Sequence, residues 1–160
     1  MAQARKPGAK KATAARKKVS TKGGAFSKEE RAAMKDHAKE AAARRRGASA
    51  AEDVKAVLAK IATFKEPDRS MARRVHDLVT AAAPELAPRL WYGMPAYARD
   101  GKVVCFFQDA GKFKVRYATL GFQDPAKLDD GAMWPTAYAV TKIGPSEEKQ
   151  ITALVRRAVR

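Results

Sequence analysis

The sequence predicts an α+β domain, in which an antiparallel sheet of about four to five strands is flanked by helices and preceded by a disordered basic tail. Three observations predict it. The aromatic and β-branched run 90–107 is divided by Asp100-Gly101, a dipeptide typical of two-residue hairpin turns. Segments before and after this run carry apolar residues at helical spacing. Residues 1–24 are rich in Lys, Arg and Ala and have too few apolar side chains to form a core.

Length and charge limit the function classes. The 160 residues suffice for one domain with a core. The net charge is +16, and residues 1–50 hold 15 basic against 4 acidic residues, which favours an N-terminal contact with a polyanion. One cysteine excludes an intramolecular disulfide, and no apolar run approaches the roughly 20 residues of a membrane span. A cytoplasmic protein with no membrane contact is expected.

Three segments follow from this charge distribution: a tail over 1–24, a basic helix over 25–47 and an α/β domain over 48–160. The tail is predicted to contact DNA or RNA without reading bases, since clustered cations neutralise phosphates but present no shaped edge. A solubilising tail with no dedicated partner is the alternative. The predicted nucleic-acid residues are Lys10, Lys11, Arg16, Lys17 and Lys18.

Capping signals place the helices. Ser27 with Glu30, and Ser49 with Glu52, form two capping boxes, and Gly47 ends the first helix. The second helix has its apolar stripe at Val54, Val57, Leu58 and Ile61, and a third has one at Met71, Val75, Leu78 and Val79. A last helix opens at Gly144-Pro145, with the stripe Ile151, Leu154, Val155, Ala158 and Val159.

The hairpin register predicts one core face and one groove face. A two-residue loop at Asp100-Gly101 pairs Arg99 with Lys102, and continuing that register pairs Tyr97 with Val104. The predicted core face is Pro95, Tyr97, Val104 and Phe106. The predicted groove face is Met94, Ala96, Ala98, Val103, Cys105 and Phe107.

Two later runs predict further strands. Residues 113–120 alternate clearly, and a four-residue loop before them would project Lys114 and Arg116 beside the groove face, which suits a small anion. Solvated cations are the alternative, and a three-residue loop would move both to the opposite face. Residues 133–140 form the last predicted strand, with Pro135 at an edge or a bulge. The predicted ligand-binding residues are Tyr92, Met94, Pro95, Cys105, Phe107, Lys114, Arg116 and Trp134.

Several stretches of this domain together resemble a known family. They are Trp91-Tyr92-Gly93-Met94-Pro95-Ala96-Tyr97, Asp100-Gly101-Lys102-Val103, Cys105-Phe106-Phe107 and Leu128-Asp129-Asp130-Gly131-Ala132-Met133-Trp134-Pro135. The chain resembles, over about residues 50–160, the bacterial YdhG-like family, a domain of unknown function grouped by name with frataxin-like proteins. The resemblance implies an antiparallel sheet with flanking helices, and an iron-chaperone role in some members.

A non-enzymatic binding domain is the predicted function. The sequence lacks a nucleophile elbow, a phosphate-cradling glycine loop and a Cys/His cluster, and Asp129-Asp130 fits a turn better than a metal site. The predicted partner is a small anionic ligand or a protein, with no cofactor and no metal ligand. Frataxin-like iron binding and delivery is the alternative. It usually needs an acidic ridge, whereas this domain is basic. An unrecognised enzyme stays open.

The tail hypothesis predicts an affinity for DNA that falls steeply with salt, because each neutralised phosphate releases condensed counterions. Deletion of residues 1–24 should abolish this affinity in a fluorescence-anisotropy titration at several salt concentrations. If the truncated chain kept its affinity, the nucleic-acid site would have to lie in the folded domain.

Overall fold

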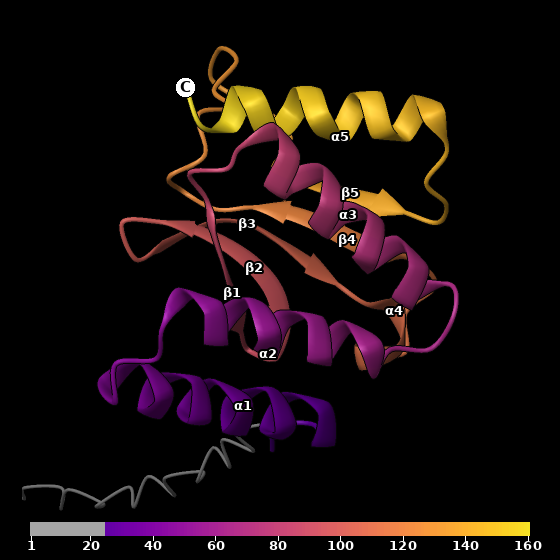
Figure 1. Cartoon of the computed structure of the whole chain (residues 1–160). Helices are drawn as coiled ribbons and strands as arrows, with labels where there is room; N and C mark the ends of the chain where they lie inside the picture. Colours follow the sequence, from indigo (N-terminus) through magenta and orange to yellow (C-terminus); the bar gives the residue numbers. More distant parts are fainter. Residues whose placement is uncertain (1–24) are drawn as a thin grey trace, which may run out of the picture.

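The fold is a meander of five antiparallel strands in the order β1-β2-β3-β4-β5, with helices covering one face of the sheet (Figure 1). The computed structural model describes residues 25–160, and the α+β class predicted above is confirmed. The predicted nucleic-acid residues of the tail lie outside the described residues. The elements are α1 (Lys28–Arg45), α2 (Ala50–Ala62), α3 (Asp68–Ala82), β1 (Ala87–Trp91), β2 (Met94–Arg99), β3 (Lys102–Gln108), α4 (Ala110–Phe113), β4 (Ala118–Phe122), β5 (Ala137–Val140) and α5 (Pro145–Ala158).

The predicted capping boxes begin α1 and α2. Ser27 Oγ accepts a hydrogen bond from the Glu30 amide at 3.1 Å, and the Glu30 carboxylate accepts one from the Ser27 amide at 2.7 Å. Ser49 and Glu52 repeat the arrangement. These reciprocal bonds satisfy amides that have no partner inside the helix. Within residues 25–160, no helix is long and apolar enough to cross a membrane.

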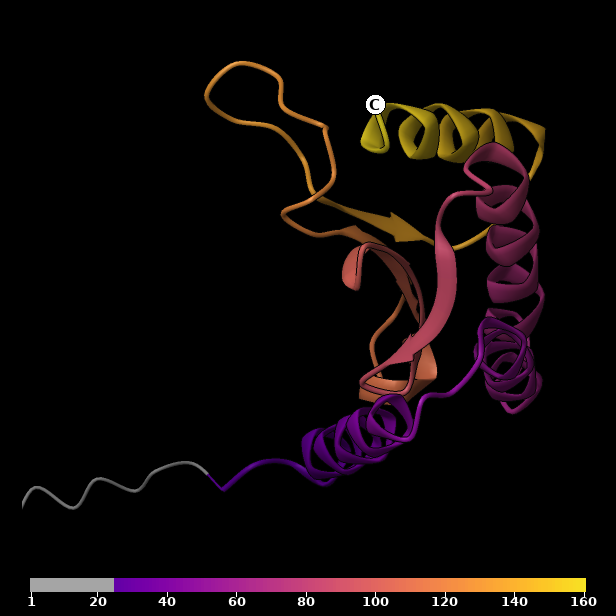
Figure 2. The ribbon, with the colours of Figure 1, turned by 60° about the vertical axis from the view of Figure 1, so that its left-hand side comes forward.

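One hydrophobic core lies between the sheet and the three helices α2, α3 and α5, which cover the same face (Figure 2). The largest fully buried side chains are Tyr97, Phe107 and Leu120. Burial of a large apolar side chain such as that of Phe107 stabilises the fold by about 1.5–3 kcal/mol. The helix stripes predicted from the sequence contribute Val57, Ile61, Met71, Val75, Val79, Ile151, Val155 and Ala158 to this core.

Two tight turns set the order of the first three strands. Asp100 and Gly101 have φ of 51° and 76°, and Tyr92 and Gly93 have φ of 50° and 71°. Positive φ at both central residues is the signature of the type I′ hairpin turn. The sequence identified the first turn but not the second, so β1 was not predicted as a separate strand.

A β-bulge corrects the predicted hairpin register. Ala98 pairs with Val103 as predicted, but the register then shifts and Tyr97 pairs with Cys105 in place of Val104. One extra residue in β3 exchanges the two faces from that point on. The predicted division into a core face and a groove face is therefore wrong beyond the bulge: Cys105 and Phe107 face the helices with Tyr97.

The predicted strands over 113–120 and 133–140 begin too early. Residues 110–113 form the short helix α4, and Lys114 caps it with φ of 54°, which interrupts any extended strand at that point. The strand β4 starts at Ala118, and β5 starts at Ala137. Lys114 and Arg116 consequently do not lie beside Cys105 and Phe107 in a strand.

The sheet face opposite the helices is closed by one aromatic contact. Phe106 pairs with Gly121 across β3 and β4, and a Cβ at position 121 would overlap the tip of the Phe106 ring. The ring also packs against Trp91, with their centroids 5.2 Å apart. Glycine at position 121 is what lets the ring of Phe106 lie flat on the neighbouring strand.

The substitution Gly121→Ala should destabilise the fold by about 1–3 kcal/mol, since an overfilled site forces its neighbours to shift. Urea denaturation would measure the change. Gly111→Ala is the matched control, because its Cβ would meet nothing nearer than 3.5 Å. Combining Gly121→Ala with Phe106→Leu should recover part of the loss, and two independent, additive losses would contradict the proposed overlap.

Candidate functional site

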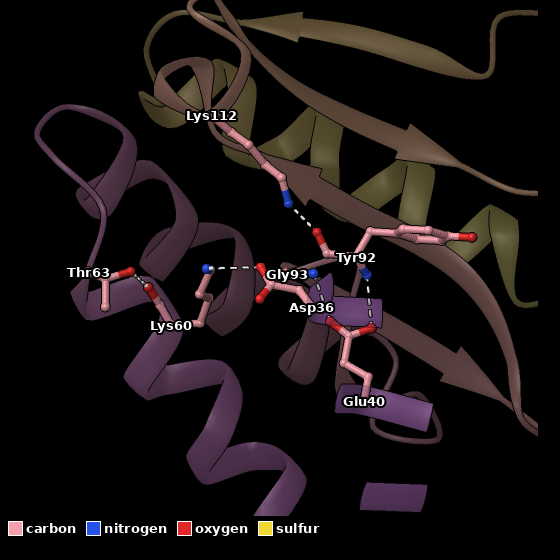
Figure 3. Close-up of polar contacts among 7 residues, drawn as sticks. All are labelled: Asp36, Glu40, Lys60, Thr63, Tyr92, Gly93 and Lys112. Carbon is pink, nitrogen blue, oxygen red and sulfur yellow. Dashed lines mark hydrogen bonds and ion pairs between the residues drawn. The ribbon is translucent and has the colours of Figure 1, made fainter. Parts of the chain in front are cut away.

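The Tyr92-Gly93 turn is held in place from two sides (Figure 3). From α1, the two oxygens of the Glu40 carboxylate accept hydrogen bonds from the amides of Tyr92 at 2.9 Å and Gly93 at 2.7 Å. From α4, Lys112 Nζ donates a hydrogen bond to the Tyr92 carbonyl. Bonds from amides to a charged carboxylate are stronger than neutral ones. This turn is therefore the point where α1 and α4 meet the sheet.

The close approach of α1 depends on Gly93 and on the ring of Tyr92. A Cβ on Gly93 would overlap a carboxylate oxygen of Asp36. The Tyr92 ring stacks on His37 with centroids 4.1 Å apart and an interplanar angle of 16°, and it meets Trp91 edge-on at 5.2 Å. A larger residue at position 93 would push α1 away from the turn.

Polar contacts dominate the attachment of α1. Asp36 lies 3.8 Å from Lys60 of α2, and Glu29 lies 2.9 Å from Lys114. Of the residues in α1, Ala33 alone is buried. The hydrogen bond from Lys114 lowers the pKa of Glu29, although this pair is exposed to solvent and contributes little stability. The helix is docked by directed polar bonds much more than by burial of apolar surface.

A cleft of about 720 Å³ opens between α1, the connection from α2 to α3, and α4. Burial raises the pKa of Asp109, and burial lowers the pKa of Lys112, so both groups are shifted toward their neutral forms. Asp68, also buried, accepts a hydrogen bond from the Gly111 amide at 3.1 Å. The charged lining residues are mixed in sign: Lys28, Lys60, Lys65, Lys112 and Lys114 with Glu29, Asp36, Asp68 and Asp109.

A second cavity, of about 310 Å³, lies between α1, α2 and β1. We name it the Arg89 pocket. Its apolar lining is Ala43, Ala56 and Leu90. Its charged lining is mainly cationic and consists of Lys39, Arg44, Arg46 and Arg89 against Glu40 and Asp53. With four cationic side chains against two carboxylates, the pocket has an excess of positive charge.

Arg89 is the residue of this pocket with an unmet hydrogen-bonding requirement. Its Nη1 donates to the Gly101 carbonyl at 3.1 Å, but its Nε is buried and has no partner within residues 25–160. Burial lowers the pKa of Arg89, and the positive charge of Arg44 lowers it further. A guanidinium presents its donors in a fixed planar fork that matches carboxylate and phosphate oxygens. The arrangement can therefore accept a small anion.

The structure distributes the ligand-binding residues predicted from the sequence over several places. Cys105 and Phe107 are fully buried under the helices, and burial raises the pKa of the Cys105 thiol to about 12. Met94 and Pro95 are buried in β2. These four residues are buried and do not line a groove; the bulge and the covering helices place Cys105 and Phe107 in the core.

The other four predicted residues lie at the surface or near it. Tyr92 is in the turn held by α1, and Lys114 lines the 720 Å³ cleft. Arg116 lies over the ring of Tyr117, with its guanidinium carbon 5.3 Å from the ring centroid. Trp134 packs, partly buried, against the core. No single cavity joins the predicted set, and contact of any member with a ligand stays a prediction.

Sequence reasoning missed Glu40, Arg89 and Lys112. Glu40 bonds to amides 52 and 53 positions further along the chain, a relation that periodicity does not reveal. The signal for Arg89 was its position in an otherwise apolar stretch, immediately before Leu90-Trp91. A charged residue is almost never fully buried unless it is paired.

Compared with protein-family models, curated proteins and solved structures, the chain has no match. Membership of the YdhG-like family therefore stays a prediction. Within residues 25–160, no three His, Cys, Asp or Glu side chains form a group that could hold a metal ion.

Replacing Glu40 by Ala should loosen α1, because it leaves two turn amides without their acceptor. Amide hydrogen exchange should show lower protection at Tyr92 and Gly93, with a loss of about 1–3 kcal/mol in stability. Lys35→Ala, an exposed change on the same helix, is the control and should leave both amides protected. Unchanged exchange in Glu40→Ala would show that the carboxylate does not hold the turn.

Proposed function

We propose that this protein is a non-enzymatic binding domain that takes up a small anion with an apolar part, such as a phosphate monoester or a carboxylate, in the Arg89 pocket. The observation that carries the proposal is the buried Nε of Arg89, which has no acceptor within residues 25–160. A buried donor without a partner typically costs about 1–3 kcal/mol, and more when it is charged. An anion in the pocket would give the guanidinium of Arg89, a lining residue, a charged acceptor.

Charge and size support the same class of ligand. Arg44 and Arg46 approach the pocket from the end of α1. Burial is the main cause that lowers the pKa of Arg89 and the charge of Arg44 adds to it, so an anion beside Arg89 would stabilise its charged form. A volume of about 310 Å³ suits a small molecule. The side chains of Ala43, Ala56 and Leu90 offer an apolar wall for the uncharged part of the ligand. A protein partner, the other possibility raised by the sequence, would need a larger surface.

Two further parts of the sequence-based hypothesis remain proposals. Non-specific contact with DNA or RNA by the tail concerns residues 1–24, and a cytoplasmic location fits the single buried cysteine. Frataxin-like iron delivery is the alternative function. A hard cation prefers a group of carboxylates. Within residues 25–160 no such group is formed, so iron delivery would need carboxylates that are not clustered there.

Calorimetric titration with phenyl phosphate tests the ligand site, with inorganic phosphate and phenol as comparison ligands. Phenyl phosphate should bind most tightly, since it alone offers both the anion and the apolar ring. Arg89→Met should weaken its binding by about tenfold or more, as expected for loss of a hydrogen bond to a charged group. A saturable titration with Fe²⁺ under the same conditions would support the iron alternative instead.

Arg116→Met is the matched control, because it removes the same charge and shape at a residue that the sequence assigned to the anion site but that lies outside the pocket. Circular dichroism would establish that both variants are folded. Equal binding by Arg89→Met and the unmodified protein would overturn the proposal. Loss of binding in Arg116→Met alone would instead support the anion site predicted from the sequence.

A further inference from the structure

The acidic and basic side chains of α1 differ in their surroundings, which its sequence does not indicate. Its four acidic residues are all engaged: Glu30 caps the helix at Ser27, Glu40 holds the Tyr92-Gly93 turn, and the other two pair with Lys60 and Lys114. Its basic residues and the capping Arg46 are all exposed: Lys28, Arg31, Lys35, Lys39, Arg44, Arg45 and Arg46.

Helical geometry places much of the positive charge on one line. Residues 28, 31, 35 and 39 recur at spacings of three and four, so they share one side of the helix. We name these four the α1 stripe: Lys28, Arg31, Lys35 and Lys39. At about 1.5 Å per residue, the stripe is roughly 17 Å long. Residues 29, 36 and 40, whose carboxylates reach the domain, lie about a third of a turn away around the helix axis.

This arrangement directs the positive electrostatic field of α1 toward solvent. The carboxylates at positions 29 and 36 are each opposed by a lysine of the domain, and the carboxylate of Glu40 is bonded to two amides. The charges of Glu29 and Asp36 are therefore offset by lysines of the domain, whereas the α1 stripe faces solvent. A line of exposed cations on a rigid helix attracts a polyanion with regularly spaced charges, and duplex nucleic acid carries one phosphate charge per roughly 1.7 Å of helix axis.

We propose that the α1 stripe binds the phosphate backbone of duplex nucleic acid, independently of base sequence. The chemistry favours a duplex over an anionic membrane surface. A helix that lies on a membrane inserts an apolar face opposite its cations, whereas the corresponding side of α1 is occupied by the sheet and α2. Met34 is the one large exposed apolar residue within α1 and does not form such a face.

This inference goes beyond the anion pocket and does not depend on it. Arg31 and Lys35 belong to the α1 stripe but line neither cavity described above.

The inference also alters the expectation for the tail, because part of the affinity for nucleic acid would reside in a folded element. Removal of the five predicted tail cations should then reduce the affinity without abolishing it.

The test uses the full chain and a fluorescein-labelled 20-bp DNA duplex, with affinity measured by anisotropy between 50 and 200 mM salt. The double substitution Arg31→Gln with Lys35→Gln should lower the slope of log affinity against log salt by about 1.8, since each lost phosphate contact removes about 0.9. Neutralising Lys10, Lys11, Arg16, Lys17 and Lys18 to Gln should leave a residual slope, which should fall by about a further 1.8 when both sets are combined.

Lys55→Gln with Lys149→Gln is the matched control, since it removes the same charge from exposed positions on α2 and α5. This control should keep the slope of the unmodified protein. An equal fall in the control would show that net charge alone is responsible and would overturn the proposal. An unchanged slope in the Arg31→Gln, Lys35→Gln protein would also overturn the proposal. So would the result that this protein binds DNA normally and loses only its binding of phosphatidylserine vesicles. Its binding of phenyl phosphate should be unaffected, which separates this test from that of the Arg89 pocket.

Discussion

The extra residue that β3 inserts beside Tyr97 determines which side chains the domain buries. Successive strand residues point to opposite faces, so a one-residue shift exchanges the faces for the rest of the strand. Beyond the shift, Cys105 and Phe107 join Tyr97 under α2, α3 and α5, and Phe106 turns to the other side. That side then needs room for a ring, which Gly121 supplies on β4. The core and the aromatic contact on the opposite face are thus linked through the bulge.

A different kind of interaction attaches α1. Its bonds are polar, and those of Glu40 reach amides 52 and 53 positions further along the chain. The helix lines both the 720 Å³ cleft and the Arg89 pocket. Both cavities therefore depend on Glu40 and Asp36, which hold α1 in place. The Tyr92-Gly93 turn has room for glycine only at position 93, because a Cβ there would overlap Asp36. Polar docking also leaves the outer surface of α1 free of any packing role, so its cations are available to a ligand without cost to the fold.

Local signals in the sequence predicted local structure well. The capping boxes at Ser27 and Ser49, the apolar helix stripes and the Asp100-Gly101 turn each act within a few residues, and each is present in the structure. The face assignment failed because no residue near Tyr97 indicates a bulge. The helix α4 was missed because all but the last of its residues were assigned to the loop before the predicted strand 113–120. The candidate site could not be predicted for a further reason. Its members Arg89 and Glu40 are brought together by tertiary docking, and neither has a motif.

The burial of Cys105 has a consequence for how the molecule can be observed. The thiol is the chain's single sulfhydryl, it is fully covered by the core, and its pKa of about 12 leaves almost no thiolate at neutral pH. Oxidation and intermolecular cross-linking are therefore blocked for as long as the helices stay on the sheet. A thiol reagent can label Cys105 only when α2, α3 or α5 separates from the sheet. The labelling rate therefore reports how often the core opens.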